Sequence, residues 1–436
     1  MQGQTHCPEC ARFLWRWLAL NDCRELTLRI LLLSFYYKPD LCAGSFRASS
    51  MVEALLNNMP ADAHLDVITT LPNRYVTYSD GASANLAELE EHPRLTIHRI
   101  PLPQHESGML DQSKSFVVFA KQALKLSKQQ NYQLIIATSS RLMTASLSSW
   151  IARRQSTPLY LDIRDIFVDT IQDVVSAKAL RWIAPVLSWV ERQTVLQAKK
   201  VNVVSEGFLP YFRERYPQQS YACFTNGIDE EFLTLNIESA EQAQVDGIGT
   251  KPIEVLYAGN IGEGQGLQHI IPGLALALKA KARFTVIGDG GRSKQLKFAL
   301  NNLSVDNVDL VPPMNRTSLI AAYLKADVLF LHLNNYPAFE KVLPSKIFEY
   351  AALGKPILAG VAGYPAKFIK QEVTNAQLFE PCDVGAAVQA FNRLQPGDTS
   401  RQAFIEKFRR SNIMDLFAKD ILSVALLSNA VTVSES

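Results

Sequence analysis

The stretch VLFLHLNNYPAFEKVLPSKIFEYAALGKPILAG (328–360) decides the fold. It holds an apolar run at 328–333, a helical segment between Pro344 and Gly354, and a second apolar run at 356–359. Proline suits the first position of a helix and glycine the position just past its end, so a helix is expected between these two residues. A strand, a helix and a further strand in this order predict α/β architecture with a parallel sheet.

The same alternation of short apolar runs and longer helical patterns continues on both sides of this stretch. The predicted strands form two series of six, at 30–35, 65–70, 96–100, 134–138, 159–163 and 201–205, and at 253–257, 284–287, 308–311, 328–333, 356–359 and 377–379. Helical patterns separate them, most clearly at 46–56, 115–127, 142–153 and 180–199. The expected fold class is therefore α/β, with two Rossmann-like, doubly wound domains facing a cleft.

The length of 436 residues also favours two domains, since a typical domain has about 150 residues. The expected division is an N-terminal extension at 1–28, a first domain at 29–225, a polar connection at 226–251, a second domain at 252–410, and a C-terminal helix and tail at 411–436. We expect the amphipathic part of this tail, 412–427, to pack back across the first domain.

The composition predicts a globular, cytoplasmic protein. Of all residues 47% are hydrophobic, and 44 basic against 42 acidic side chains leave a net charge of +2. Such a balance lacks the basic footprint of nucleic-acid-binding proteins, so no nucleic-acid partner is expected. No run reaches the roughly 18 apolar residues of a membrane-spanning helix. Six scattered cysteines are typical of reduced thiols in the cytoplasm.

The first residues carry two further patterns. Cys7 and Cys10 form a CPEC pair, but no complementary pair follows, so no metal site is expected there. Aromatic and basic side chains interleave at 12–18, as in helices that lie on a membrane surface. Peripheral contact with the inner face of the cytoplasmic membrane is therefore a further expectation.

Two glycine-rich turns precede helices in the second domain. They are YAGNIGEGQG (257–266), with Gly259 and Gly262, and VIGDGG (286–291), with Gly288. Glycine lets a ligand approach the backbone, and the following helix offers free N–H groups, so both turns predict phosphate binding. A tight turn without a ligand is the alternative. A nicotinamide cofactor is disfavoured, because no acidic residue ends the next strand to hold a ribose.

The helix of the opening stretch carries the most specific binding pattern. Ser345 and Glu349 lie four residues apart and share a face, and Lys346 lies in the first turn. A carboxylate one turn from a helix N-terminus can accept hydrogen bonds from a ribose diol while a diphosphate binds the free N–H groups. A solvated Glu349 is the alternative, and the two glycine turns upstream argue against it. Lys346 predicts an anion beside it, since a lysine at a helix N-terminus is otherwise unfavourable.

Three segments of the sequence resemble those of a known family. PSKIFEYAALGKPILAG (344–360), LYAGNIGEGQGL (256–267) and FTNGID (224–229) are similar to the retaining glycosyltransferases of family four, which have the two-Rossmann glycosyltransferase-B (GT-B) fold. The resemblance covers residues 29–427 and is strongest to the N-acetylfucosaminyl and related aminosugar transferases of bacterial O-antigen and capsule synthesis. Further matching segments are SFYYKPDLCAGSFR (34–47), RDIF (164–167) and VVSEGF (203–208).

The resemblance implies that a UDP-sugar donor binds the second domain and a lipid-linked or saccharide acceptor binds the first. It implies retaining transfer of an N-acetylated aminosugar without a metal ion or another cofactor. The implied donor-binding residues are Gly44, Gly259, Asn260, Gly262, Gln265, Gly288, Pro313, Met314, Lys341, Pro344, Ser345, Lys346 and Glu349. The implied acceptor-side residues are Tyr37, Arg47, His105, Ser139 and Arg164. The residues expected to be catalytic are Asp165, Lys346 and Glu349.

The chain departs from the wider family at three places. Lys341 stands where the wider family has the first glutamate of Glu-x7-Glu, of which Glu349 is the second. Asn260 and Gln265 stand where the wider family has an arginine and a lysine that neutralise the diphosphate. Residues 139–141, Ser-Ser-Arg, replace a frequent active-site histidine.

Two other functions stay open at this point. A nucleotide-sugar 2-epimerase has a similar two-domain architecture, and its acid and base would come from Asp165, His105 and Glu106. A non-catalytic nucleotide-sugar-binding protein would need the donor side alone.

Overall fold

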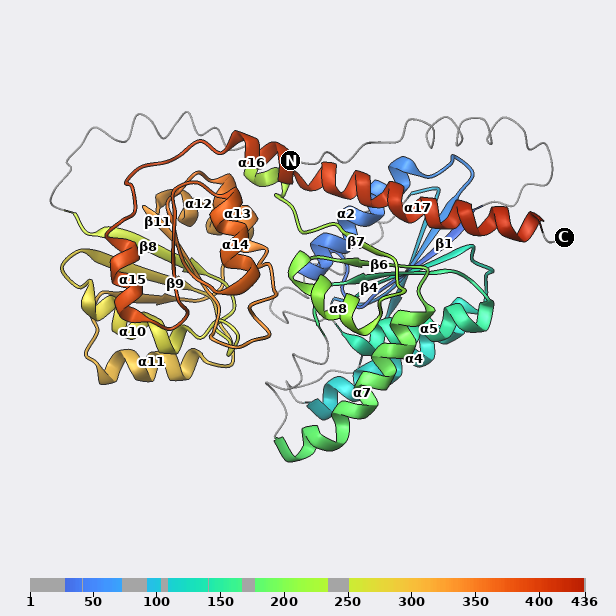
Figure 1. Cartoon of the computed structure of the whole chain (residues 1–436), viewed down its shortest axis with the longest axis horizontal. Helices are drawn as coiled ribbons and strands as arrows, with labels where there is room; N and C mark the ends of the chain where they lie inside the picture. Colours follow the sequence, from blue (N-terminus) through green and yellow to red (C-terminus); the bar gives the residue numbers. More distant parts are fainter. Residues whose placement is uncertain are drawn as a thin grey trace.

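The computed structural model describes residues 28–40, 42–72, 92–102, 109–139, 141–166, 177–233 and 251–434. Two α/β domains lie beside each other in it (Figure 1). Within these ranges, every helix is too short or too polar to cross a membrane.

The first domain is built on a parallel sheet of seven strands. In chain order the strands are β1 (Arg29–Ser34), β2 (His64–Thr70), β3 (Leu95–Ile100), β4 (Leu134–Ser139), β5 (Leu159–Ile163), β6 (Lys200–Val203) and β7 (Tyr221–Cys223). Their order in the sheet is β3-β2-β1-β4-β5-β6-β7, which reverses direction between β1 and β4. Ligands of open α/β sheets bind at the carboxyl ends of the strands beside such a reversal. The six predicted strands are present, and β7 is an additional edge strand.

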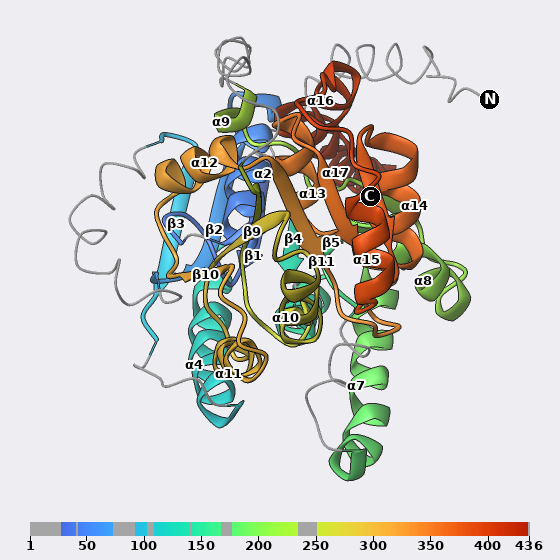
Figure 2. The same ribbon diagram turned by 90° about the vertical axis from the view of Figure 1, so that its left-hand side faces the viewer.

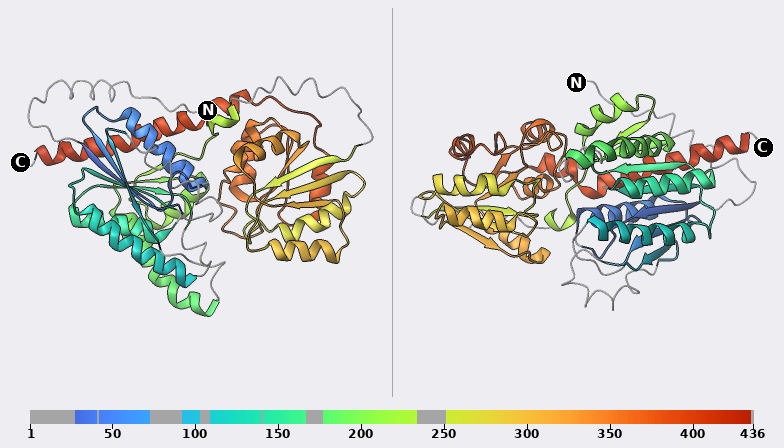
Figure 3. Two further views of the ribbon diagram at one scale, coloured as in Figure 1. Left: turned by 180° about the vertical axis from the view of Figure 1, so that it is seen from behind. Right: turned by 90° about the horizontal axis from the view of Figure 1, so that it is seen from below.

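Helices cover both faces of this sheet. The long C-terminal helix α17 (Arg410–Ser434) packs on α2 (Ala43–Asn58) on one face. The other face carries α4 (Met109–Ser127), α5 (Leu142–Gln155) and α7 (Ala177–Gln197) (Figure 3). The short helices η2 (Glu206–Phe208) and α8 (Leu209–Arg215) follow β6.

The second domain is a parallel sheet of six strands. They are β8 (Ile253–Ala258), β9 (Ala282–Ile287), β10 (Val308–Val311), β11 (Val328–His332), β12 (Ile357–Gly360) and β13 (Ala376–Phe379), in the sheet order β10-β9-β8-β11-β12-β13. The helices are α10 (Leu267–Ala277), α11 (Ser293–Asn302), α12 (Arg316–Lys325), α13 (Lys346–Ala352), α14 (Gly363–Glu372), α15 (Val384–Phe391) and α16 (Gln402–Phe408). All six predicted strands are present, so the predicted fold class is confirmed.

The motif helix begins two residues later than predicted. Helix α13 starts at Lys346 with Ser345 as its N-cap, and Pro344 lies just before the cap. The predicted end is confirmed, because Gly354 has a left-handed φ of 73° just past the helix.

The C-terminal helix crosses back to the first domain, as the sequence predicts. Nδ2 of Asn58 on α2 donates to Asp415 on α17 at 2.8 Å, and the hydroxyl of Tyr160 on β5 donates to Asp420 at 2.6 Å. In its described residues, 226–233 and 251, the predicted connection between the domains contains one short helix, α9 (Glu230–Leu233). The chain therefore links the domains twice, through α9 and through α17.

The carboxyl edges of the two sheets face each other. The hydroxyl of Ser205, just after β6, donates to the carbonyl oxygen of Lys341 at 2.6 Å. A Cβ on Gly207 would overlap the same carbonyl, so this contact between the domains requires glycine. Figure 2 views the molecule along its long axis, with the second domain in front of the first. Residues that follow the strands of both sheets therefore share one interdomain region.

Candidate functional site

The two glycine turns pack directly against each other. Gly259 follows β8 with a φ of 152°, and Gly288 follows β9 with a φ of 147°. A Cβ on Gly288 would overlap the carbonyl oxygen of Gly259, so only glycine lets the two backbones approach this closely. Gly266, with a φ of 58°, ends the first turn as the N-cap of α10. The structure thus brings both predicted phosphate-binding turns to one place.

The side chain of Lys346 reaches the first of these turns. A Cβ on Gly259 would lie 2.5 Å from Cε and 3.0 Å from Nζ of Lys346. Burial lowers the pKa of Lys346, and the nearby charge of Glu349 opposes this shift. A partly buried ammonium group beside a glycine turn is a suitable contact for a phosphate.

The two uncharged replacements in the first turn bind each other. Nδ2 of Asn260 donates to Oε1 of Gln265 at 3.0 Å across the turn, and a Cβ on Gly262 would overlap the Asn260 amide. The hydroxyl of Tyr257 holds the carbonyl of Asn260 at 2.7 Å. The turn therefore keeps its shape without the two cations of the wider family, and Lys346 lies against it at Gly259.

Glu349 is engaged by two residues of α12. Nη1 of Arg316 lies 3.3 Å from Oε1 of Glu349, and the hydroxyl of Tyr323 lies 3.4 Å from Oε2. Arg316 also binds Asp229 at 2.9 Å and Glu231 at 2.7 Å, both in the connection between the domains. Burial alone would lower the pKa of Arg316, but the charges of these three carboxylates outweigh it and raise that pKa.

Arg316 was missed by the sequence analysis, although a signal for it exists. It is the first residue of α12, where a cation opposes the helix dipole unless anions surround it. Its guanidinium also lies 4.7 Å from the ring centre of Phe232 and 5.5 Å from that of Phe46 in the first domain. Arg316 therefore contacts α13 through Glu349, the connection between the domains through Asp229, and the first domain through Phe46.

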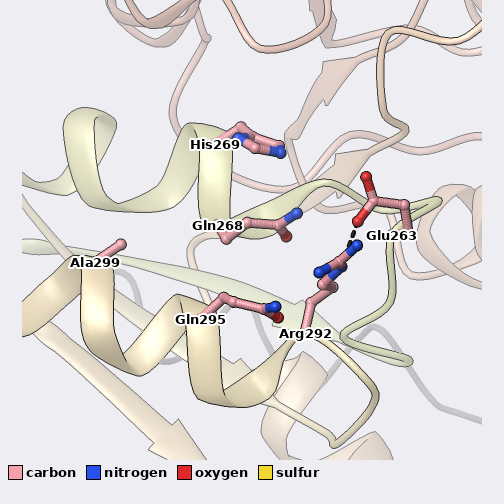
Figure 4. A pocket seen from close by; sticks show the side chains of 6 residues that line it. All are labelled: Glu263, Gln268, His269, Arg292, Gln295 and Ala299. Atoms are coloured by element: carbon pink, nitrogen blue, oxygen red, sulfur yellow. Dashed lines mark hydrogen bonds and ion pairs between the residues drawn. The ribbon is translucent and has the colours of Figure 1, made fainter.

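A pocket of about 350 Å³ lies between α10, α11 and the first glycine turn (Figure 4). Its lining residues are Glu263, Gln268, His269, Arg292, Gln295 and Ala299. Glu263 forms an ion pair with Arg292 and accepts a hydrogen bond from the Tyr336 hydroxyl at 2.6 Å. The Tyr336 hydrogen bond, aided by Arg292, lowers the pKa of Glu263. Through Glu263, the first turn therefore contacts Arg292, which follows the second turn, and Tyr336, which lies in the loop after β11.

The buried His332 also supports the first turn. The backbone N–H of Cys382 donates to its Nε2 at 3.0 Å, so the proton of the neutral ring is on Nδ1, which donates to the carbonyl of Gln265 at 2.6 Å. Burial lowers the pKa of His332 to about 4. The sequence analysis did not identify this residue.

In the first domain, Arg164 and Gly44 lie together. A Cβ on Gly44, in the first turn of α2, would lie 2.5 Å from Nη1 of Arg164, which follows β5. Among the residues that the structure describes, the guanidinium of Arg164 has no hydrogen-bond or ion-pair partner. Burial lowers the pKa of Arg164, with Asp162 opposing and Arg47 adding to the shift. An arginine without a local partner at a glycine-containing helix N-terminus can bind an anion.

Two residues expected on the acceptor side are instead in the core. Arg47 is 0% exposed and forms a bidentate pair with Asp162, both bonds being 2.8 Å long. It also donates to the carbonyls of Phe224 and Thr225. Tyr37 is 1% exposed and belongs to the hydrophobic core. Both expectations are corrected, because side chains without exposed surface cannot contact an acceptor in this arrangement.

The remaining predicted site residues lie at different positions in the two domains. The hydroxyl of Ser139 closes a local turn by donating to the carbonyl of Arg141 at 2.6 Å, and Asp165 follows β5 half-buried. Nζ of Lys341 lies 5.6 Å from the ring centre of Tyr211 in the first domain, so it is directed across the interface. Pro313 and Met314 follow β10, with Pro313 exposed and Met314 against the core. His105, Glu106 and residues 1–27 lie outside the described residues.

Within the described parts of the chain, no group of three or more His, Cys, Asp or Glu side chains could hold a metal ion. Metal-independent chemistry stays a prediction.

Both domains match families of known proteins. Residues 48–227 match the glycosyl transferase 4-like domain, and residues 238–411 match glycosyl transferases group 1. WcaI of Escherichia coli (strain K12), described as a glycosyl transferase of colanic acid biosynthesis, is 24% identical over 338 residues, which are 75% of this chain and 82% of WcaI.

Solved structures share the fold. WaaG, a glycosyltransferase involved in lipopolysaccharide biosynthesis, has a TM-score of 0.59 at 14% identity, covering 91% of this chain and 95% of WaaG. HepE of Anabaena, solved with UDP-glucose, has a TM-score of 0.58 at 15% identity, covering 94% of this chain and 100% of HepE. With both domain families in sequence order on this fold, the chain is a GT-B glycosyltransferase that combines a glycosyl transferase 4-like domain with a glycosyl transferases group 1 domain.

Proposed function

We propose that the protein is a retaining glycosyltransferase that moves an N-acetylated aminosugar from a UDP-sugar to a lipid-linked or saccharide acceptor in surface polysaccharide synthesis. One observation supports the proposed donor-binding site. The Lys346 ammonium lies against Gly259, and Glu349 lies one turn further along the same short helix. The biosynthetic roles in the descriptions of WcaI and WaaG, and the UDP-glucose bound to HepE, support the proposed substrate classes.

In this proposal, the diphosphate binds at the paired glycine turns and Lys346, and the ribose hydroxyls bind Glu349. Arg316 holds Glu349 in the absence of a donor, so the ribose exchanges with Arg316 for this carboxylate. A hydrogen bond to a charged acceptor contributes roughly 1.5 to 3 kcal/mol, which is enough for this exchange when the diphosphate binds at the same time.

The reaction needs no protein nucleophile. The bond between the anomeric carbon and the diphosphate oxygen breaks, and the acceptor oxygen bonds to the same face of the sugar. The acceptor proton passes to the leaving diphosphate oxygen. The protein contributes by positioning both substrates and by stabilising the negative charge that grows on the diphosphate. We assign this stabilisation to Lys346 from the second domain and to Arg164 from the first.

The test is to incubate the pure protein with a panel of UDP-sugars in excess EDTA, and to measure UDP release with and without saccharide and lipid-linked acceptors. Acceptor-dependent UDP release together with a product that keeps the anomeric configuration of the donor is expected. Conversion of a UDP-sugar into its C2 epimer, or UDP-sugar binding without any turnover, would instead support one of the two alternatives. Activity that is lost in EDTA and restored by Mg²⁺ or Mn²⁺ would contradict the metal-independent mechanism.

A further inference from the structure

Three helices of the first domain expose an unusual number of large apolar side chains. The outward surface of α4, α5 and α7, here called the α4–α5–α7 face, exposes Val117, Met143, Trp150, Ile183, Val186, Trp189 and Leu196. Trp189 is 62% and Val186 is 59% exposed. Single apolar residues on a surface are common, but clustered ones that include tryptophan mark a binding surface.

These side chains share one side of the domain. Ile183, Val186 and Trp189 follow one another at spacings of three residues on α7, which places them along one stripe of the helix. Helix α5, which carries Trp150, packs between α4 and α7, on the face of the sheet opposite α2 and α17 (Figures 1 and 3). The stripe of α7 is therefore continued by α5 and α4.

The charged residues of this face have one sign. Among the described side chains of these helices and their C-terminal ends, the exposed ionisable residues are Lys114, Lys121, Lys125, Lys128, Arg153, Arg154, Arg192 and Lys199. Among the described side chains of the three helices, the one acidic residue is Glu191, which is 1% exposed and accepts hydrogen bonds from Tyr211 and Tyr216. Because the whole chain carries a net charge of only +2, this concentration of basic residues is local.

Basic and aromatic groups are also in direct contact. The guanidinium of Arg154 lies 4.7 Å from the ring centre of Trp150. Tryptophan prefers the boundary between acyl chains and headgroups, and arginine and lysine extend from apolar surroundings toward anionic headgroups.

We propose that the α4–α5–α7 face docks the protein onto the surface of an anionic lipid bilayer. A second copy of the chain is a poor occupant, because the same cations would face each other across the contact. A nucleic acid would pair with the cations but would leave Ile183, Val186 and Trp189 without an apolar partner. An anionic bilayer matches both the charge and the exposed apolar stripe.

Docking has a consequence that rests on the proposed function. It places the first domain, which is the expected acceptor side, at the surface where a lipid-linked acceptor is located. The α4–α5–α7 face is built from other residues than 12–18, for which the sequence predicts membrane contact and which lie outside the described part of the chain.

The experiment is co-sedimentation of the full chain with vesicles of phosphatidylcholine alone and of phosphatidylcholine with 30% phosphatidylglycerol. One variant combines Val186→Ser with Trp189→Ser, and a second combines Lys121→Glu with Lys125→Glu. Helix α11 in the second domain offers matched controls, since Lys294, Lys297 and Phe298 are exposed there: Phe298→Ser, and Lys294→Glu with Lys297→Glu.

We expect the wild type to bind the anionic vesicles, with binding that falls as salt is raised. Each α4–α5–α7 variant should lower the partition coefficient by about tenfold or more, because each removes apolar insertion or basic charge. The α11 controls should bind like the wild type. No binding to anionic vesicles, or equal losses in the controls, would overturn the proposal.

Two further measurements distinguish membrane docking from dimerisation, and the docking surface from the proposed transfer reaction. A wild-type dimer in light scattering that becomes a monomer on Val186→Ser with Trp189→Ser would also overturn the proposal, because the face would then join two copies. UDP release with a soluble acceptor should be unchanged in all variants. If no variant and no wild type releases UDP while vesicle binding depends on the face, the proposed transfer reaction fails and the docking surface stands.

Discussion

Nη1 of Arg316 lies 3.3 Å from Oε1 of Glu349, so the carboxylate proposed to hold the ribose is already bound to the protein. The same guanidinium binds Asp229 between the domains at 2.9 Å. If the ribose of the donor binds Glu349, the contact between Glu349 and Arg316 is lost. Arg316 also contacts the connection between the domains, so donor binding would affect that contact as well. The ribose site and the interdomain contact are linked through one side chain.

The first prediction concerns Glu349. Glu349→Ala should weaken UDP binding by about 1 to 3 kcal/mol, because hydrogen bonds from the ribose to a charged acceptor are lost. Isothermal titration calorimetry with UDP measures this. Glu231→Gln is the control, since Glu231 also binds Arg316 but is largely exposed. UDP affinity equal to that of the wild type would remove Glu349 from the donor site.

The second prediction concerns Lys346. Lys346→Ala should lower both kcat and UDP affinity, by roughly 2 to 4 kcal/mol in total, because its charge opposes a negative charge that grows in the transition state. Lys355→Ala is the control, as Lys355 lies after the same helix and pairs with Asp398 at 3.2 Å. Steady-state kinetics with an unchanged kcat/KM for Lys346→Ala would place the diphosphate elsewhere.

Most of the fold could be predicted from the sequence. Each of the twelve predicted strands is present within a few residues, because buried parallel strands are continuous apolar runs bounded by turns. The strand Tyr221–Cys223 was missed, since a half-buried edge strand of three residues has no comparable apolar run.

The candidate site was predictable only in part. Local patterns pointed to the glycine turns, Lys346 and Glu349, because turn, helix cap and helix face are all set within a few residues. The partners of Arg316 lie 33, 85 and 87 residues away in the chain, and no spacing rule connects them. Arg47 was misplaced for the same reason, since its buried partner Asp162 lies 115 residues further along the chain.

The third prediction tests the packing of the glycine turns. Gly288→Ala should destabilise the second domain by about 3 kcal/mol or more, because the new Cβ would overlap the carbonyl of Gly259 and the φ of 147° is unfavourable for alanine. Gly291→Ala is the matched control, as a Cβ there meets no atom within 4 Å. Calorimetry measures the melting temperatures of both variants. Equal melting temperatures would contradict the close contact between Gly288 and Gly259.

The fourth prediction is a pH dependence of stability. The pKa of His332 is about 4 in the folded protein, against an ordinary value of 6.5. The unfolded chain therefore binds more protons between these pH values, and the free energy of unfolding should fall as pH is lowered from 6.5 to 4. The slope from this group is at most about 1.4 kcal/mol per pH unit. His332→Gln should show a shallower dependence in denaturant unfolding at pH 4.5, 5.5 and 7; equal slopes would contradict the assignment.

The last prediction concerns Arg164, which lies against Gly44 at the N-terminus of α2. The first glycine turn carries Asn260 and Gln265, which bind each other at 3.0 Å and leave the diphosphate charge to other groups. Arg164→Gln should therefore weaken UDP binding by about 1 to 3 kcal/mol and lower kcat as well, as expected for a charge-assisted contact to the leaving group. Arg283→Gln is the control, since Arg283 pairs with Asp309 on the exposed side of β9 and β10.

A charge-relocation variant distinguishes this role from a structural one. If Arg164 acts through its charge on the diphosphate, adding Asn260→Arg to Arg164→Gln should restore part of both UDP affinity and kcat, because the new cation lies at the glycine turn where the wider family carries one. A structural defect at Gly44 would not respond to a cation on the other domain. Full activity of Arg164→Gln, or a double variant no better than Arg164→Gln alone, would leave Lys346 as the main cation of the site.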